Sequence, residues 1–154
     1  MSRHLSNDRA SKSMKSRWLS CHASFQSLPI WVRVWVAAIL IPINLLPFFF
    51  LDTPTGQAAA IAAIFVTLTN VPIMLRERGM SRLMSVPHLI AWIPLLVFLI
   101  QHLLRPPALA NGEWLLAVGL VAINGLSLLF DAVDSWRWWR GERGVPGQTL
   151  GVAQ

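Results

Sequence analysis

The side chains best suited to chemistry lie on one stripe near the end of the chain. Ser127, Asp131 and Asp134 follow Asn124 at intervals of three, seven and ten residues. At about 100° per residue, the four fall within roughly an 80° sector of a helix. Two carboxylates one helical turn apart can share a cation or a proton. The stripe is therefore a candidate path for protons or cations, or a candidate surface for binding them.

A second pair of polar residues is expected at the depth of the two aspartates. Asn70 closes one apolar block, and His88, whose charge changes near neutral pH, begins the next. We therefore predict a polar cluster that binds a cation or relays protons, with Arg76, Arg78 and Arg82 close by. The predicted cluster consists of Asn70, His88, Asp131 and Asp134.

The same residues also have a purely structural interpretation, which stays open at this point. Arg137 follows Asp134 by three residues and can form a local ion pair with it. Polar groups within apolar helices also fix packing through interhelical hydrogen bonds. The residues assigned to such bonds are Asn44, Thr67, Asn124 and Ser127, and we expect Asn44 to pair with Asn124.

No metal or cofactor site is predicted. His102 follows His88 by 14 residues, which is about 21 Å along a helix, so the two cannot share one metal or haem. The chain contains no G-x-S-x-G, H-E-x-x-H, Walker A or C-x-x-C pattern, and we assign it no catalytic residues. A role as an enzyme on lipid or quinone is the least favoured of the membrane functions.

The elements that must position these residues are transmembrane helices. Of the 154 residues, 55% are hydrophobic and only 13% are charged, against about 25% charged in ordinary soluble domains. Four apolar blocks approach the roughly 17 to 25 residues that cross a bilayer as a helix. We predict an all-α membrane protein, a four-helix transmembrane bundle, with spans at about 34–51, 57–75, 86–104 and 114–130.

The basic residues predict the orientation of the bundle. Twelve of the thirteen Lys and Arg residues fall on one side of this layout, and only Arg105 falls on the other. By the positive-inside rule, both termini are cytoplasmic, and we expect a bacterial inner membrane. Topology thus accounts for the net charge of +6 without nucleic-acid binding.

The regions outside the bundle are expected to have little structure. Residues 1–27 contain five Lys or Arg and eight Ser with no apolar periodicity, which predicts a disordered, basic cytoplasmic segment. The transmembrane domain is assigned to residues 28–140, and 141–154 to a flexible cytoplasmic tail. Cys21, the single cysteine, excludes an internal disulfide and is interpreted as an incidental thiol.

Two stretches of the chain resemble a known group of proteins. They are Ser81-Arg82-Leu83 with 87–96 (PHLIAWIPLL), and 128–134 (LLFDAVD). In these stretches the chain is similar to small hypothetical four-span proteins of proteobacteria, and the resemblance covers most of residues 28–143. It implies the same four-span architecture and assigns no activity.

Two functions from different classes follow from these patterns. The favoured one is a non-enzymatic subunit that acts through contacts with a membrane-protein partner or with copies of itself, as an accessory, assembly or regulatory component. A face of small residues on the second span, including Gly56, Ala59, Ala60 and Ala63, supports it because small residues let helices approach closely. The alternative is an oligomeric channel or carrier for a proton, cation or small solute.

Overall fold

The protein is an all-helical, multi-pass membrane protein. The computed structural model describes residues 2–105 and 110–148, without the side chains of residues 2–12 and 111. Within these described residues, four helical stretches are long and apolar enough to cross a membrane: Ile30–Phe49, Pro54–Glu77, Arg82–Leu103 and Gly112–Trp139. The four predicted spans are confirmed. Each helical stretch extends beyond its predicted range at one or both ends.

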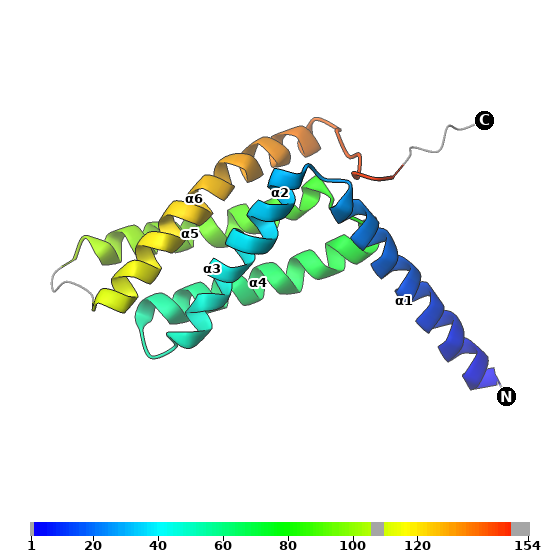
Figure 1. Ribbon diagram of the computed structural model, residues 1–154, viewed down its shortest axis with the longest axis horizontal. Helices are drawn as coiled ribbons and strands as arrows, with labels where there is room; N and C mark the ends of the chain where they lie inside the picture. The colour runs from blue at the N-terminus through cyan, green and yellow to red at the C-terminus, as the bar shows by residue number, and fades with distance from the viewer. Residues whose placement is uncertain (1, 106–109, 149–154) are drawn as a thin grey trace.

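The elements follow the chain in the order shown in Figure 1. The helix α1 precedes the bundle, the first span is built from four short helical pieces, and α4, α5 and α6 form the remaining spans. Their bounds are α1 Ser2–Gln26, α2 Ile30–Val34, η1 Trp35–Leu40, α3 Ile41–Leu45, η2 Leu46–Phe49, α4 Pro54–Glu77, η3 Arg82–Met84, α5 Ser85–Leu103 and α6 Asn111–Trp139.

Two prolines divide the first span. A proline within a helix lacks an N–H donor, and its ring clashes with the carbonyl four residues earlier. Ahead of Pro42, the chain widens into the π-helical η1, and at Pro47 it tightens into the 3-10 helix η2. Both adjustments change the hydrogen-bonding pattern where the α-helical one cannot continue.

The start of α4 explains why the turn after the first span is so tight. Thr53 caps the helix, its hydroxyl oxygen accepting a hydrogen bond from the Gly56 amide at 3.0 Å, and Pro54 occupies the first turn. A Cβ atom on Gly56 would lie 1.9 Å from the Phe50 carbonyl oxygen. Only glycine therefore permits this approach of the backbone to the end of the first span.

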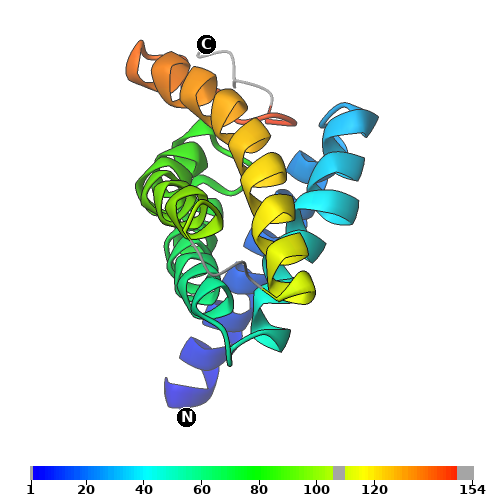
Figure 2. The same cartoon turned by 90° about the vertical axis from the view of Figure 1, so that its left-hand side faces the viewer.

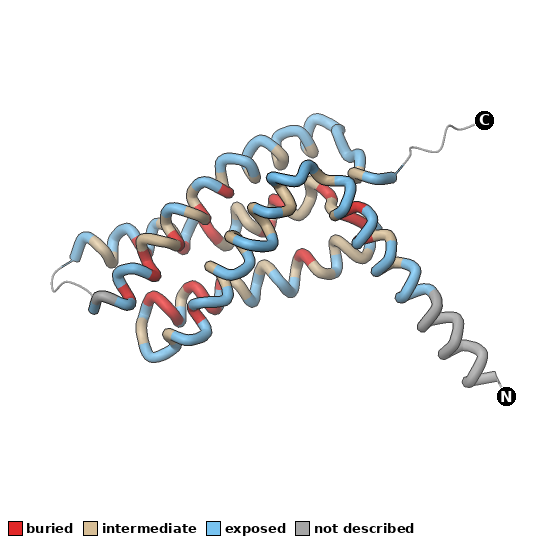
Figure 3. Tube along the Cα trace, viewed as in Figure 1, coloured by how far each residue is buried: buried red, intermediate tan, exposed pale blue. Residues whose placement is uncertain are grey.

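The core lies among α4, α5 and α6. Buried residues, shown in red in Figure 3, are concentrated in α4, α5 and α6, whereas most residues of the first span are exposed or intermediate. Figure 2 shows α6 between the first span on one side and the α4–α5 pair on the other. The core cluster consists of Ala59, Ala62, Trp92, Leu95, Leu99, Leu116, Ala117 and Leu120.

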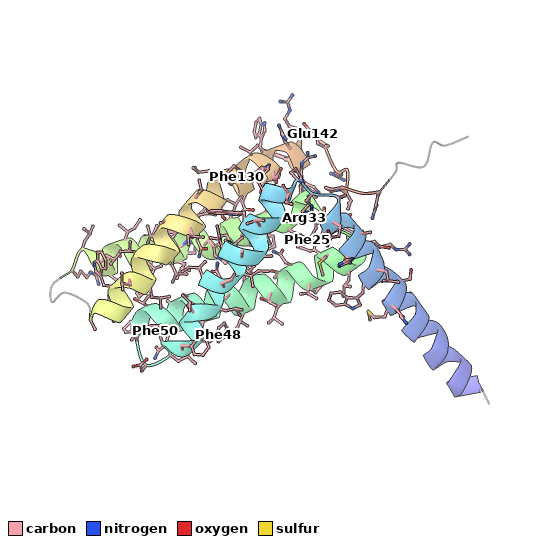
Figure 4. All side chains as sticks on the ribbon, in the orientation of Figure 1. Phe25, Arg33, Phe48, Phe50, Phe130 and Glu142 are labelled. Carbon is pink, nitrogen blue, oxygen red and sulfur yellow. The ribbon has the colours of Figure 1, made fainter. Side chains whose placement is uncertain are left out.

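The two ends of the bundle differ in charge. Arg33 and Glu142 lie at one end, and Phe48 and Phe50 lie at the other (Figure 4). We call the first the basic end; it comprises residues 15–33, 76–85 and 131–148. The other, comprising residues 46–56 and 102–114, is called the opposite end. Arg105, after the end of α5, is the exception predicted from the sequence.

The prediction that residues 1–27 are disordered is wrong for the described backbone, because Ser2–Gln26 forms α1. Its C-terminal half packs against the bundle. The Cys21 thiol donates to the Met74 carbonyl oxygen at 3.3 Å, and the Ser24 hydroxyl accepts from the Met80 amide at 2.9 Å. Cys21 and Ser24 are small side chains buried at this contact, which lets α1 lie close to the end of α4.

The predicted flexible tail contacts the bundle as far as Gln148, and its flexibility stays a prediction. The Gln148 side-chain amide donates to the carbonyl oxygens of Glu77 and Arg78, at 2.9 and 3.2 Å, at the end of α4. Nearby, a Cβ atom on Gly79 would lie 2.5 Å from Val145 Cγ1 and 2.6 Å from Ser24 Oγ. The tail, α1 and the loop after α4 thus meet at Gly79. Residues 149–154 of the predicted tail lie outside the described residues.

Candidate functional site

The polar stripe on α6 faces the rest of the bundle. Its members continue a spacing of alternating three and four residues that starts near the helix N-terminus, and this spacing keeps one face of a helix toward its neighbours. The middle of the face is buried, with Asn124 at 0% exposure and Ser127 at 4%. The full row is Glu113, Ala117, Leu120, Asn124, Ser127, Asp131 and Asp134.

Three of the four residues in the predicted cluster meet next to the basic end, each from a different helix. His88 of α5 places its Nδ1 at 3.2 Å from an Asp131 carboxylate oxygen on α6. Its Nε2 lies 2.9 Å from the Asn70 side-chain nitrogen on α4. If Nδ1 carries the proton and donates to Asp131, Nε2 accepts from the Asn70 amide. Asn70, His88 and Asp131 thus link the three core helices.

The histidine ring is held on its face as well as on its edge. Trp92, one helical turn further along α5, stacks on His88 with a centroid distance of 4.3 Å and an interplanar angle of 2°. This contact fixes the plane of the imidazole while the two hydrogen bonds fix its rotation in that plane.

Some buried polar atoms at this cluster make no hydrogen bond to the described residues. Asn70 Oδ1, Asp131 Oδ2 and Trp92 Nε1 are buried and have no hydrogen-bond partner among the described residues. A buried polar group without a partner costs about 1 to 3 kcal/mol, and such groups are uncommon in folded proteins. Among the described residues, Asn70 Oδ1 and Asp131 Oδ2 are thus acceptors, and Trp92 Nε1 a donor, that remain unpaired.

Asp134 is not part of this cluster, in contrast to the prediction. It forms an ion pair with Arg82, whose Nε lies 3.2 Å from the Asp134 carboxylate. Arg82 also donates to the Glu142 backbone oxygen at 3.0 Å. The Asp134 side chain is 46% exposed, and its partner is Arg82 of η3 rather than the local Arg137 that its spacing suggested. We assign this pair to fixing the α6 end against η3.

Two predicted interhelical contacts join the first span to α6. Asn44 and Asn124 exchange a pair of hydrogen bonds, with nitrogen-to-oxygen distances of 2.8 and 3.1 Å. The expectation that they pair is confirmed. One turn closer to the basic end, the Trp35 indole donates to the Ser127 hydroxyl at 3.2 Å. These bonds hold the weakly buried first span to the core.

The assignment of Thr67 to an interhelical hydrogen bond is wrong. Its side chain is exposed, and its hydroxyl donates to the Ala63 carbonyl oxygen of the same helix at 2.8 Å. A serine or threonine in a helix can satisfy its hydroxyl in this way without any neighbouring helix. The residue type alone therefore could not distinguish the two arrangements.

A second histidine–carboxylate pair, at the opposite end, was missed by sequence reasoning. The buried Glu113 carboxylate lies 3.4 Å from His102 Nε2 and accepts a hydrogen bond from the Thr55 amide at 3.2 Å. That amide belongs to the first turn of α4, where an anion is favoured. The signal was present, because Glu113 lies on the same face of α6 as Asn124, three turns earlier.

An apolar layer separates the two polar ends. Between Glu113 and Asn124, the inward face of α6 consists of Ala117 and Leu120, both fully buried. Leu95 and Leu99 of α5 belong to the same core cluster. The polar groups are therefore concentrated in two regions rather than in a continuous path through the described residues.

No protein-family model matches the chain, and no curated protein or solved structure matches it either. The resemblance drawn from residues 81–96 and 128–134 therefore stays a prediction.

Proposed function

We propose that this protein is a non-enzymatic membrane subunit that acts through contacts with another membrane protein, as an accessory, assembly or regulatory component. The observation that supports this best is an apolar groove of about 470 Å³ between α4 and α5. Three alanines, Ala58, Ala62 and Ala91, contribute to its lining, and Phe65 and Phe98 flank them. Small residues allow a further helix to approach closely, which is a common basis of helix association in lipid.

The use of the polar side chains agrees with this proposal. Asn44, Asn124 and Ser127 bond within the bundle and fix the packing of its own helices. The apolar layer of Ala117 and Leu120 interrupts the polar stripe of α6, whereas a path for an ion needs polar or hydrated surroundings. Within the described chain, a single copy thus has the features of a rigid scaffold more than those of a conduit.

The proposal can be tested by filling the groove. In an Ala58→Leu variant, the added side chain occupies space between α4 and α5, whereas Ala122→Leu adds the same atoms at an exposed position on α6. Mass spectrometry of the mildly solubilised complex should show a partner with the wild type and with Ala122→Leu, and its loss with Ala58→Leu. Circular dichroism checks that both variants fold. A wild-type protein that is strictly monomeric and partner-free would overturn the proposal.

A carrier or channel for a proton or small cation is the second candidate, and one observation favours it. The buried Asn70 Oδ1 and Asp131 Oδ2 without partners are acceptors that a cation would satisfy. Conduction past the apolar layer would require surfaces supplied by several copies. Flux into liposomes that is present with the wild type and absent with Asp131→Asn would move this candidate to first place.

We further propose that the basic end faces the cytoplasm of a bacterial inner membrane. The supporting observation is the separation of Arg33, Arg76 and Arg137 at one end from Arg105 at the other. An impermeant maleimide should label Arg105→Cys in intact spheroplasts and Arg143→Cys only after lysis, both in a Cys21→Ser background. The reverse pattern would refute this orientation.

A further inference from the structure

Among the described side chains of α1, those near its C-terminal end pack against the bundle. Cys21 and Ser24 are buried against the end of α4 and the loop that follows it. The helix then leaves the basic end crosswise to the spans, as Figure 1 shows. In the view of Figure 2, its N-terminal part extends past the outline of the bundle. A helix in this position lies alongside the membrane surface rather than across the membrane.

One face of α1 carries a stripe of larger and apolar side chains. Met14, Trp18, Cys21 and Phe25 are spaced by four, three and four residues, which places them within roughly a 60° sector. The bundle covers the C-terminal part of this stripe but not the rest. Met14 is 51% exposed and Trp18 is 48% exposed. The stripe thus continues from a protein contact into an apolar surface that no other described residue covers.

Basic residues flank the exposed part of the stripe. Lys15 and Arg17 lie about 70 to 90° to either side of its centre, one on each flank. From such positions, long basic side chains reach toward headgroups while their stems cover apolar surface. Residues 13–27 contain no Asp or Glu. The charge of this surface therefore complements an anionic partner.

The level at which α1 leaves the bundle matches the lipid–water boundary. Trp31, Trp136 and Trp139 are exposed at the same end of the spans. Exposed tryptophan at the end of a transmembrane helix favours the headgroup layer. Since α1 joins the bundle at this level, Met14 and Trp18 lie within reach of that layer.

We propose that residues 13–20 of α1 form an interfacial segment that binds anionic lipid headgroups. Met14 and Trp18 insert toward the acyl chains, and Lys15 and Arg17 bind the phosphates on either side. Helices with an apolar stripe flanked by basic residues bind anionic membranes in this manner, with a strength that depends on the fraction of anionic lipid. This inference is independent of the partner that occupies the α4–α5 groove.

The test uses the full chain with a spin label at one of two positions two residues apart. Met14→Cys places the label on the stripe, and Ser16→Cys places it on the opposite face of the same helix turn. Both are made in a Cys21→Ser background, because serine retains a donor for the Met74 carbonyl. The proteins are placed in nanodiscs of phosphatidylcholine alone or mixed in equal parts with phosphatidylglycerol. Collision with oxygen reports lipid exposure, and collision with a nickel chelate reports water exposure.

In the anionic discs, the Met14 label should favour oxygen and the Ser16 label should favour nickel. Replacing Lys15 and Arg17 by glutamine should abolish the oxygen preference at Met14, and high salt should weaken it in the unmodified helix. Equal nickel exposure of the two labels in anionic discs would overturn the proposal. So would protection of the Met14 label in detergent micelles together with spin–spin coupling between copies, because a second chain would then cover the stripe.

Discussion

The paired amides of Asn44 and Asn124 allow a prediction in which two substitutions of the same kind have different costs. Replacing Asn44 by leucine strands both polar atoms of the Asn124 side chain, which is 0% exposed. Replacing Asn124 strands only the Asn44 oxygen, because the Asn44 nitrogen keeps its hydrogen bond to the Leu40 carbonyl at 2.9 Å. Asn44 is also the less buried partner. The first substitution should therefore be the more destabilising.

The magnitude follows from the number of stranded groups. Each buried group without a partner costs about 1 kcal/mol or slightly more, the lower part of the usual range, since hydrogen bonds in lipid contribute modestly. We therefore expect Asn44→Leu to lower the free energy of unfolding by about 2 to 3 kcal/mol and Asn124→Leu by about 1 kcal/mol. The double variant leaves no group stranded and should lie within about 1 kcal/mol of the wild type.

The free energy of unfolding of all four proteins can be measured by reversible unfolding in mixed micelles. Sodium dodecyl sulfate serves as the denaturant, and circular dichroism gives the signal. Trp35→Phe serves as a control that removes a single neighbouring hydrogen bond, the one from the indole to Ser127. Equal costs of the two single substitutions, or a double variant whose cost is their sum, would refute the argument from stranded groups.

The remaining predictions concern the basic end. Burial raises the pKa of the Cys21 thiol. Alkylation of Cys21 at mildly alkaline pH should therefore be about tenfold slower, or more, in the folded protein than in the unfolded chain. The reaction should accelerate as rising pH forms the thiolate. Gly79→Ala should speed this labelling, because the added methyl group pushes α1, the tail and the loop after α4 apart. Gly144→Ala should not, because a Cβ atom at Gly144 has no other atom within 4 Å. Asp131→Leu strands the His88 ring nitrogen and should cost about 1 to 3 kcal/mol, whereas Asp134→Leu removes a half-exposed ion pair and should cost under about 1 kcal/mol. The same micelle titration ranks the last two, and equal costs would contradict the separate roles given to them.

Much of the candidate site could be anticipated because helix geometry is local. The depth of a residue along a span follows from its position in the sequence, at 1.5 Å per residue. Depth alone brought Asn44 to the level of Asn124, and Asn70 to that of His88, as the structure shows. The rotation of each helix about its axis is not local, and Thr67 was misplaced for that reason.

Sequence by itself determined the number of spans, their approximate limits and the face of α6 that is polar, because bilayer thickness and helical period are properties of a single segment. Tertiary structure decided which polar groups meet. Asp131 and Asp134 lie one turn apart on one stripe, yet one contacts His88 and the other contacts Arg82. The pairing of Glu113 with His102 likewise depends on how α5 and α6 cross. Such choices follow from the packing angles and rotations of whole helices, which no short stretch of sequence specifies.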